Sequence, residues 1–190
     1  MSEALLTDLR FHRLLLAYDE DLAMQARAGR CLRCGGVLHS ARYTRKPRGL
    51  PAGLGAQYRQ RFSFCCSVEG CRQRMTPRSL RFLGRKVYAA PVVVLASALR
   101  VGATSAARRR LQEWVGASRR TLTRWHRWWR ETFVRTAFWQ AVRGAVHAPV
   151  STDALPASLL ERFVGDLTTQ LLALLRFLGP LTGGTAVHAM

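Results

Sequence analysis

The chain has 190 residues, of which 48% are hydrophobic, and its formal net charge is +19. This length fits one medium domain or two small ones, and the hydrophobic content excludes wholesale disorder. Arginine supplies nearly all of the positive charge, because Lys46 and Lys86 are the only lysines.

The positive charge is concentrated in the middle of the chain. Residues 40–86 contain 12 basic residues and one acidic residue, and residues 87–143 contain 11 basic and two acidic residues. Residues 1–39 are neutral, and residues 144–190 carry a net charge of −1. A positive centre between nearly neutral ends favours a polyanionic partner, most often DNA or RNA. The alternative is a general arginine bias that only keeps the protein soluble, but such a bias would charge the ends as well.

Residues 1–30 are expected to form an N-terminal helix. Leucines recur at roughly helical spacing between residues 4 and 28, and Gly29 can end the helix. The helix carries an acidic cluster at residues 19–21. Because three successive carboxylates cannot converge on one point of a helix, we expect them to pair with arginines or to face solvent.

Nothing in the sequence indicates secretion or a membrane span. The first residues lack the basic segment and cleavage site of a signal peptide. The longest uncharged apolar run, at residues 87–99, is too short to cross a bilayer. We therefore expect a cytoplasmic protein without membrane contact, and in that compartment cysteines are more often metal ligands than disulfides.

Residues 31–86 are expected to form a small β-rich module of the zinc-ribbon type. Residues 37–43 and 58–65 alternate well enough to be strands, and the glycine- and proline-rich stretch between them is typical of a loop. In the second strand, one face should pack inward and the other should present Arg59 and Arg61 to solvent.

The five cysteines form two close groups. Cys31 and Cys34 form a CxxC followed by two glycines, and the segment CCSVEGC contains Cys65, Cys66 and Cys71. Tetrahedral zinc takes four soft ligands, and two cysteine pairs brought together by a hairpin provide them. The amides of a CxxC can also turn tightly and hydrogen-bond the sulfurs. We expect the zinc to be structural, because four thiolates leave no open position for a substrate.

The doubled cysteine leaves the choice of the third ligand between Cys66 and Cys65. We favour Cys66, because it lies on the same face of the strand as Phe64, and Cys65 would then point to the other face. His39 is an alternative ligand, but it lies in the middle of a strand. A redox role for the CxxC needs a thioredoxin-like βαβ context that the sequence lacks. The predicted ligand set is therefore Cys31, Cys34, Cys66 and Cys71.

Residues 87–143 are expected to form a three-helix bundle of the helix-turn-helix type. The helices should run from about residue 88 to 100, from 105 to 115 and from 118 to about 139. Gly116 permits a sharp turn between the last two helices, and Ser118 is a good N-cap residue.

The third of these helices is expected to have two faces. At 100° per residue, the apolar face consists of Leu122, Trp125, Trp129, Thr132, Phe133 and Thr136. The opposite face consists of Arg120, Arg124, Arg127, Glu131 and Arg135, and Trp128 lies on the border. We expect the tryptophans of the first face to pack in the core and the arginines to point toward solvent or DNA.

This arrangement predicts how the bundle would meet duplex DNA. The second helix of a helix-turn-helix enters the major groove with its N-terminus first, and an arginine can read guanine with two parallel hydrogen bonds. Base edges would be contacted by Arg119, Arg120, Thr123 and Arg124, and phosphates would be held by Arg108, Arg109, Arg110 and Arg127. The alternative is that these arginines form only a solvated face.

Residues 144–190 are expected to form a connector, an amphipathic helix over residues 157–178 and a loose tail. This last helix would either cap the bundle or mediate homodimerisation. Its apolar side chains are Leu159, Leu160, Phe163, Leu167, Leu171, Leu174, Leu175 and Leu178.

The order of the two motifs resembles a known family. A cysteine ribbon, CLRCGG…FCCSVEGCRQRMT, is followed by RRLQEWVGASRRTLTRWHRWW. This order is similar to the N-terminal DNA-binding part of bacterial insertion-sequence transposases, and the resemblance covers roughly residues 31–139. It implies recognition of DNA end sequences, with the four cysteines as the scaffold and Arg119, Arg120 and Arg124 as readers.

The catalytic half of such a transposase is not evident. Phosphodiester transfer by two metal ions needs converging carboxylates on a larger domain, and only Asp153, Glu161 and Asp166 follow the predicted helix-turn-helix. We therefore expect a non-enzymatic, mainly α protein with a small β zinc-ribbon module, which binds specific DNA sequences as an accessory or regulator of a mobile element. The alternatives are an RNA-binding zinc-ribbon protein, a catalytic transposase subunit, and an interaction module whose arginines meet an acidic partner.

Overall fold

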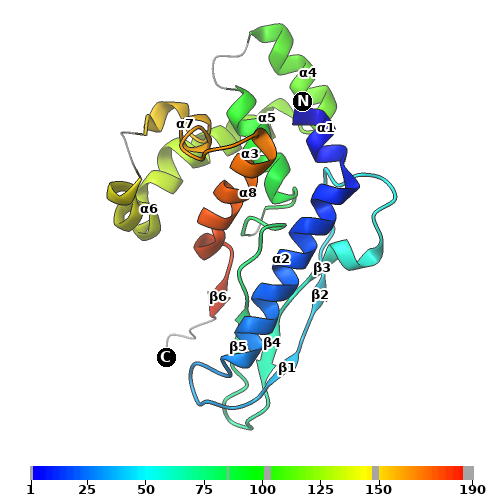
Figure 1. Cartoon of the computed structure of the whole chain (residues 1–190), viewed down its shortest axis with the longest axis vertical. Coiled ribbons are helices and arrows are strands. Elements are labelled where there is room, and N and C mark those ends of the chain that lie inside the picture. The colour runs from blue at the N-terminus through cyan, green and yellow to red at the C-terminus, as the bar shows by residue number, and fades with distance from the viewer. Residues whose placement is uncertain (1, 85, 101–103, 147–149, 186–190) are drawn as a thin grey trace.

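A computed structural model of the chain describes residues 2–84, 86–100, 104–146 and 150–185 (Figure 1). The described chain is mostly helical with a small antiparallel sheet, which confirms the predicted mainly α class. The helices are α1 (Ser2–Thr7), α2 (Leu9–Ala28), α3 (Ala90–Arg100), α4 (Ser105–Val115), α5 (Arg119–Arg127), α6 (Ala137–Val142), α7 (Ala157–Leu160) and α8 (Leu167–Phe177). The strands are β1 (Leu38–Ser40), β2 (Tyr43–Thr44), β3 (Gln60–Arg61), β4 (Phe64–Cys66), β5 (Arg74–Thr76) and β6 (Gly184–Thr185).

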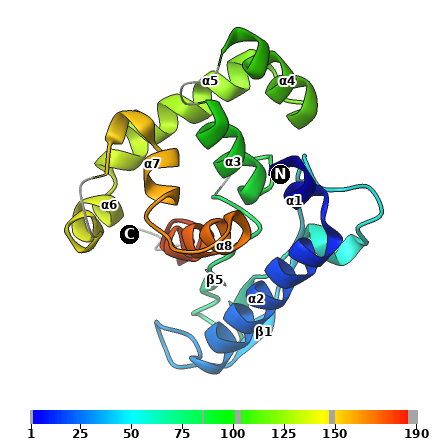
Figure 2. The same ribbon diagram turned by 45° about the horizontal axis from the view of Figure 1, so that its top comes forward.

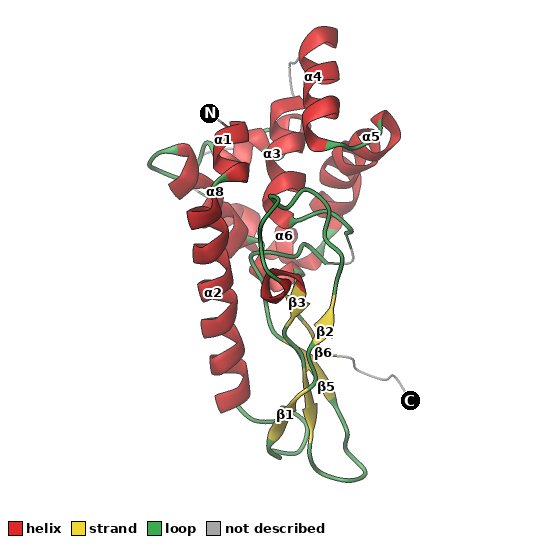
Figure 3. Ribbon diagram, turned by 90° about the vertical axis from the view of Figure 1, so that its right-hand side faces the viewer, coloured by secondary structure: helices red, strands yellow, loops and turns green. Residues whose placement is uncertain are grey.

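Helix α2 links the two ends of the molecule. It runs beside the strands, and most of the other helices gather around its N-terminal half (Figure 3). Its first half packs Phe11 and Leu15 into a large helical core. Its second half packs Leu16 and Ala23 into a smaller core shared with the cysteine-containing module. The helix predicted over residues 1–30 is therefore not a separate segment, because both cores depend on it.

The main sheet contains four antiparallel strands in the order β1-β4-β5-β6. Leu38 lies opposite Cys66 in the β1–β4 ladder, and β6 pairs with β5 by placing Thr185 opposite Met75. Strands β2 and β3 form a second, two-stranded ladder. The sequence correctly predicted an antiparallel pairing here, but each predicted strand is split in two. The C-terminal strand β6 was not predicted, since a two-residue strand has no recognisable pattern.

One member of the acidic cluster on α2 is buried in a polar network. Asp19 is fully buried and accepts hydrogen bonds from the hydroxyl of Ser79 and from the backbone amide of Leu80. Arg81, itself only 4% exposed, donates from Nε to the Asp19 carboxylate at 2.8 Å. The remaining guanidinium nitrogens of Arg81 donate to backbone carbonyls, including that of Tyr58 at 3.0 Å. We expected the acidic residues either to pair with arginines or to face solvent, and Asp19 pairs with an arginine. The network thereby connects α2 to the cysteine module.

The prediction that Arg61 faces solvent is wrong. Arg61 is 2% exposed, whereas Arg59 is exposed as expected. The alternation fails because residues 58–65 do not form one continuous strand: a 3-10 turn ends at Arg59, and Phe62 and Ser63 separate β3 from β4. The guanidinium of Arg61 donates to the carbonyls of Pro77 and Thr182, and burial lowers its pKa.

Helix α3 forms the centre of the helical core (Figure 2). It packs against α1, α4, α5, α7 and α8. Val93, Val94 and Ala96 are completely buried, and burying such a valine contributes on the order of 1.5–3 kcal/mol. The apolar run at residues 87–99 therefore belongs largely to a helix of the core.

The helix predicted from residue 118 to 139 is interrupted. Helix α5 ends at Arg127, and a π-helical turn (Trp128–Thr132) and a 3-10 turn (Phe133–Arg135) follow. Thr136 then adopts an extended conformation and caps α6 by accepting a hydrogen bond from the amide of Trp139. The sequence offers no glycine or proline at this point, so the break was not predictable from local signals.

The predicted C-terminal helix is also split, because residues between α7 and α8 turn at Gly165, which has a φ of +116°. Asp166 caps α8 by accepting a hydrogen bond from the amide of Thr169 at 2.8 Å. Most apolar side chains of these two helices are buried against the chain's own core, among them Leu159, Leu171 and Leu174. These side chains therefore cap the helix bundle, which is one of the two roles expected for this region. The other role, homodimerisation, stays a prediction.

The start of the C-terminal tail is tied down rather than loose. The hydroxyl of Thr182 accepts a hydrogen bond from the amide of Ser79 and donates to the carbonyl of Gly179. Strand β6 follows directly, and residues 186–190 lie outside the described part of the chain. Within the described residues, no helix combines the length and the apolar character needed to cross a bilayer.

Candidate metal centre and candidate nucleic-acid interface

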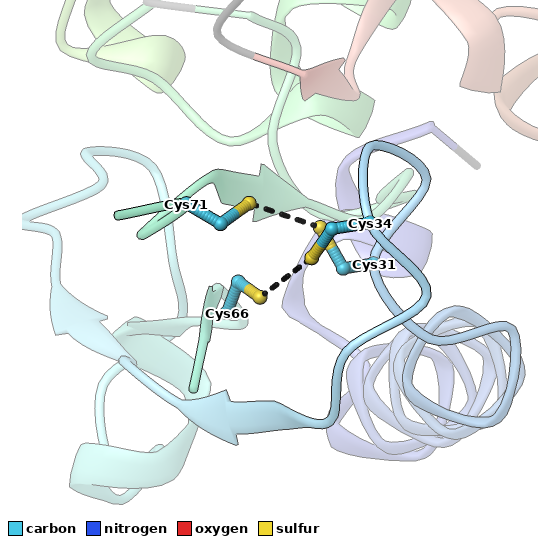
Figure 4. Close-up of side chains that lie close together, drawn as sticks. All are labelled: Cys31, Cys34, Cys66 and Cys71. Atoms are coloured by element: carbon cyan, nitrogen blue, oxygen red, sulfur yellow. Dashed lines mark hydrogen bonds between the residues drawn. The ribbon is translucent and has the colours of Figure 1, made fainter. Parts of the chain in front are cut away.

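Four of the five cysteines converge at one end of the sheet. The sulfurs of Cys31, Cys34, Cys66 and Cys71 all lie within 4.8 Å of one another, with 3.8 Å between Cys31 and Cys71 and 3.4 Å between Cys34 and Cys66 (Figure 4). Zinc–sulfur bonds of about 2.3 Å place the sulfurs of a tetrahedral site about 3.8 Å apart. The four predicted ligands therefore form a group that could hold a metal ion, and all of them are free thiols rather than disulfides.

Two similar backbone turns present the four sulfurs. In the first turn, the amide of Arg33 donates a hydrogen bond to Cys31, and the amide of Gly36 donates one to Cys34. Each cysteine thus accepts from the amide two residues further along the chain. The same two-residue offset recurs in the second turn, where the amide of Val68 hydrogen-bonds to Cys66. Gly35 at a φ of +70° lets the first turn reverse tightly enough for its amide to reach the carbonyl of Cys31. Amides that converge on sulfur favour thiolates and thereby favour metal coordination.

The thiols differ in acidity. The hydrogen bond from the amide of Arg33 is the main cause that lowers the pKa of Cys31 to about 7. In Cys34, Cys66 and Cys71 a backbone amide also favours the thiolate, but desolvation and the neighbouring sulfurs outweigh it and raise the pKa. A bound cation would reverse this balance, because thiolates are the form that coordinates metal.

The structure resolves the ambiguity of the doubled cysteine. Cys66 is fully buried and belongs to the cluster, while Cys65 points to the other face of β4, where its sulfur lies 3.6 Å from the carbonyl of Arg72. Phe64 is buried in the same small core as Cys66, as its position on the strand predicted. His39 is exposed in β1, opposite Cys65 and outside the cluster.

Gly36 makes the tightest approach to the cysteine cluster. A Cβ atom at this position would lie 3.0 Å from the sulfur of Cys66 and 2.5 Å from a methyl group of Val68. We expect Gly36→Ala to displace the second turn and to weaken metal binding by about 10- to 100-fold, measured by competition with a chelator. Gly29→Ala is the matched control, because its Cβ would meet only ordinary contacts of 3.6 Å. Equal metal affinity in the two variants would contradict the expected crowding.

Helices α4 and α5 are joined by a three-residue connection. Gly116 adopts the left-handed conformation at a φ of +62° and closes α4, and Ala117 is buried. Ser118 then caps α5 by accepting a hydrogen bond from the amide of Thr121. Tyr88 supports the connection, since its hydroxyl donates to the carbonyl of Gly116 at 3.0 Å. Helix α3 packs against both α4 and α5, so the three segments predicted as a bundle do lie together (Figure 2).

The two predicted faces of α5 are largely as expected. Leu122, Trp125, Trp129 and Phe133 are buried, and Trp129 and Phe133 form an edge-to-face pair with ring centroids 5.0 Å apart. The predicted DNA contacts on α5 are all exposed: Arg119, Arg120, Thr123, Arg124 and Arg127. Thr132, which was assigned to the apolar face, is exposed as well, although Trp129 and Phe133 on either side of it are buried.

The arginines of α4 are placed only in part. Arg109 and Arg110 are exposed on α4, whereas the side chain of Arg108 lies outside the described part of the structure. Across the described residues, only Arg127 among the predicted DNA contacts forms an ion pair, a solvent-exposed one with Glu131 at 3.8 Å. An exposed pair of this kind contributes little to stability.

A basic groove next to α5 was not predicted. It has a volume of about 750 Å³, and we name it for its three cations, Arg48, Lys86 and Arg124. Gly84 and Thr121 also line it, and the rest of its lining is apolar or aromatic, including Tyr88, Trp125 and Trp128. The Lys86 ammonium lies 4.2 Å from the centre of the Trp128 ring. Sequence reasoning missed it because its two walls are far apart in the chain, and the only available signal was that Lys86 is one of two lysines in an arginine-rich protein.

The three carboxylates that follow the helix bundle do not converge. Asp153 forms an ion pair with Arg130 at 2.6 Å, Asp166 caps α8, and Glu161 is exposed at the end of α7. Among the described residues, the cysteine cluster is the only group of metal-ligating side chains. The expectation that the protein lacks transposase chemistry stays a prediction.

Comparison of the chain with family models, with curated proteins and with solved structures gives no match. The resemblance to the DNA-binding part of insertion-sequence transposases therefore stays a prediction that depends on the motifs alone.

Proposed function

We propose that the protein is a zinc-stabilised, sequence-specific DNA-binding protein. The observation that carries the proposal is the exposed arginine face of α5, which follows a sharp turn and is backed by buried tryptophans. Among the described residues, no carboxylate pairs with the N-terminal arginines of α5, and a rigid helix of this kind is suited to the major groove of duplex DNA. Zinc is the metal that best suits four closely spaced thiolates.

The charge distribution supports a nucleic-acid partner over an acidic protein. Residues 40–143 carry the whole of the net positive charge, and they contain most of the cysteine module and the helices α3 to α5. Arginines spread over two modules match the extended charge of a phosphate backbone. Duplex DNA is favoured over RNA because the narrow major groove of an RNA helix does not admit an α-helix.

We further propose that the protein acts together with a mobile element. This part of the proposal rests on the order of the cysteine ribbon and the following helices, which resembles the DNA-binding part of insertion-sequence transposases. In this role the protein would recognise a short DNA sequence as an accessory or regulator, without cutting DNA itself.

Arg120 and Arg124 test the reading of bases. A binding site is first selected from random duplexes with the zinc-loaded protein. We expect Arg120→Ala and Arg124→Ala each to weaken binding to the selected site by about 10- to 100-fold and to weaken binding to random duplex much less. Arg135→Ala is the matched control, since Arg135 is also exposed but lies beyond the end of α5.

Two outcomes of this experiment would contradict the proposal. Equal losses on selected and random duplex would mean that these arginines contact only phosphates. Stronger competition by structured RNA than by duplex DNA would favour the RNA-binding alternative instead.

A further inference from the structure

The basic groove brings three cations together without an acidic partner. Arg48 comes from the loop of the cysteine module, Lys86 from the segment before α3, and Arg124 from α5. None of the described residues that line the groove is acidic. Within the described chain, none of these three cations forms an ion pair. Like charges gathered in this way repel one another unless an anion lies between them.

The walls of the groove are held in place by contacts that do not use its cations. Arg45 donates from its two terminal nitrogens to the carbonyls of Gly84 and Lys86, at 2.7 and 2.8 Å. The amide of Arg48 donates to the carbonyl of Val87. Gly49 lies so close to α3 that a Cβ there would be 2.8 Å from a methyl group of Val92. The loop is therefore fixed against the helical core largely by its backbone, and the Arg48 guanidinium lies 6.0 Å from the centre of the Tyr88 ring, which lines the same groove.

The surroundings of Lys86 disfavour the charged form of its side chain. It lies over the Trp128 ring, and burial together with the charge of Arg124 lowers its pKa to about 8. Among the described residues, the other charged groups around it are Arg48 across the groove and Arg45, whose guanidinium is bound to the Lys86 carbonyl. An anion in the groove would offset the repulsion and return the pKa of Lys86 toward its ordinary value.

We propose that the basic groove binds backbone phosphates of the nucleic-acid strand that α5 contacts. The inference rests on the proposed function, because it takes the strand to lie along α5. Arg124 belongs to both surfaces, so a strand contacted by the N-terminal part of α5 would continue toward Lys86 and Arg48. The groove would thus couple the cysteine module to the helix bundle through one bound strand.

The two lysines allow a direct test of whether nucleic acid occupies the basic groove. An amine-reactive acylating reagent modifies Lys46 and Lys86, and mass spectrometry quantifies each adduct with and without random-sequence duplex DNA or a single-stranded oligonucleotide. We expect either nucleic acid to suppress the modification of Lys86 more than that of Lys46, an exposed lysine outside the groove. Unchanged modification of Lys86 by a bound nucleic acid would overturn the inference.

Substitutions distinguish the groove from α5. We expect the double variant Arg48→Gln/Lys86→Gln to bind duplex DNA at least about tenfold more weakly, and to lower the slope of log affinity against log salt by about two, because two phosphate contacts are lost. Lys86→Arg should retain most of the affinity, and Lys46→Gln should change neither quantity. The affinity of the wild type should also fall as the pH rises from 7 to about 9, since binding then requires proton uptake by Lys86, and Lys86→Gln should lack this fall.

The outcomes separate the two proposals. If the double variant binds duplex with the affinity and salt dependence of the wild type, the groove inference is wrong and the role of α5 stands. If duplex fails to bind while a single strand protects Lys86, the proposed reading of duplex DNA is wrong and the groove remains a phosphate site. If neither nucleic acid protects Lys86, the groove inference is wrong.

Discussion

Replacement of Cys66 by serine is expected to abolish the zinc binding that we propose and to unfold the cysteine module, whereas replacement of its neighbour Cys65 is expected to do neither. Cys66 is buried and lies in the four-sulfur cluster, while the sulfur of Cys65 lies outside the cluster, near the carbonyls of Cys66 and Arg72. Structural zinc sites contribute roughly 10–16 kcal/mol of apparent binding free energy. The loss of one thiolate therefore removes far more than the few kcal/mol by which a small module is stable.

This pair of variants is compared by two measurements. Elemental analysis of the purified proteins should give about one zinc per chain for the wild type and for Cys65→Ser, and close to none for Cys66→Ser. Thermal unfolding should show a lower midpoint for Cys66→Ser alone. Zinc retained by Cys66→Ser but lost from Cys65→Ser would mean that the other cysteine of the doublet is the ligand.

Replacement of Asp19 by asparagine is expected to destabilise the protein by about 3–5 kcal/mol, because it leaves the buried Arg81 guanidinium without its counter-charge. Asp19 is completely buried, and three groups donate to its carboxylate. The network joins α2 to residues 79–81 and, through Arg81, to the backbone of residues 57–60. Its loss should loosen the contact between α2 and the cysteine module as well as lower the overall stability.

Asp21→Asn is the matched control for this prediction, because Asp21 lies on the same helix and is exposed. Its effect should stay within about 0.5 kcal/mol in chemical denaturation. Hydrogen exchange should show faster exchange of the amide of Leu80 in Asp19→Asn, since that amide donates to the carboxylate. Equal stability of the two variants would show that the buried pair does not hold the module to α2.

The sequence predicted best those features that depend on local spacing. The cysteine ligand set followed from the tight turns that CxxC and Cys66-x4-Cys71 allow, and the choice of Cys66 followed from its place on the strand. The faces of α5 followed from the helical repeat, because Leu122, Trp125 and Trp129 lie within two turns of one another. In each case the pattern itself is local, although Cys34 and Cys66, which meet in the cluster, are 32 residues apart in the chain.

Features that join distant segments were not predictable. The helical repeat places Asp19 on the same face of α2 as Leu15 and Ala23, but no local pattern shows which arginine meets it there, because Arg81 is 62 residues away. Arg61 turns inward because it bonds to carbonyls from two remote segments. The basic groove likewise needs a loop, a connector and a helix to meet. Burial of polar groups depends on the completed tertiary fold, which a periodic pattern does not contain.

Protection of guanine N7 from methylation tests most directly whether the arginines of α5 read bases in the major groove. Dimethyl sulfate is applied to the selected duplex, free and bound to the zinc-loaded protein. We expect guanines of the site to be protected in the complex and to become reactive again with Arg120→Ala or Arg124→Ala, since a bidentate arginine covers N7 and O6. A saturated complex in which every guanine N7 stays as reactive as in free DNA would contradict major-groove recognition by α5.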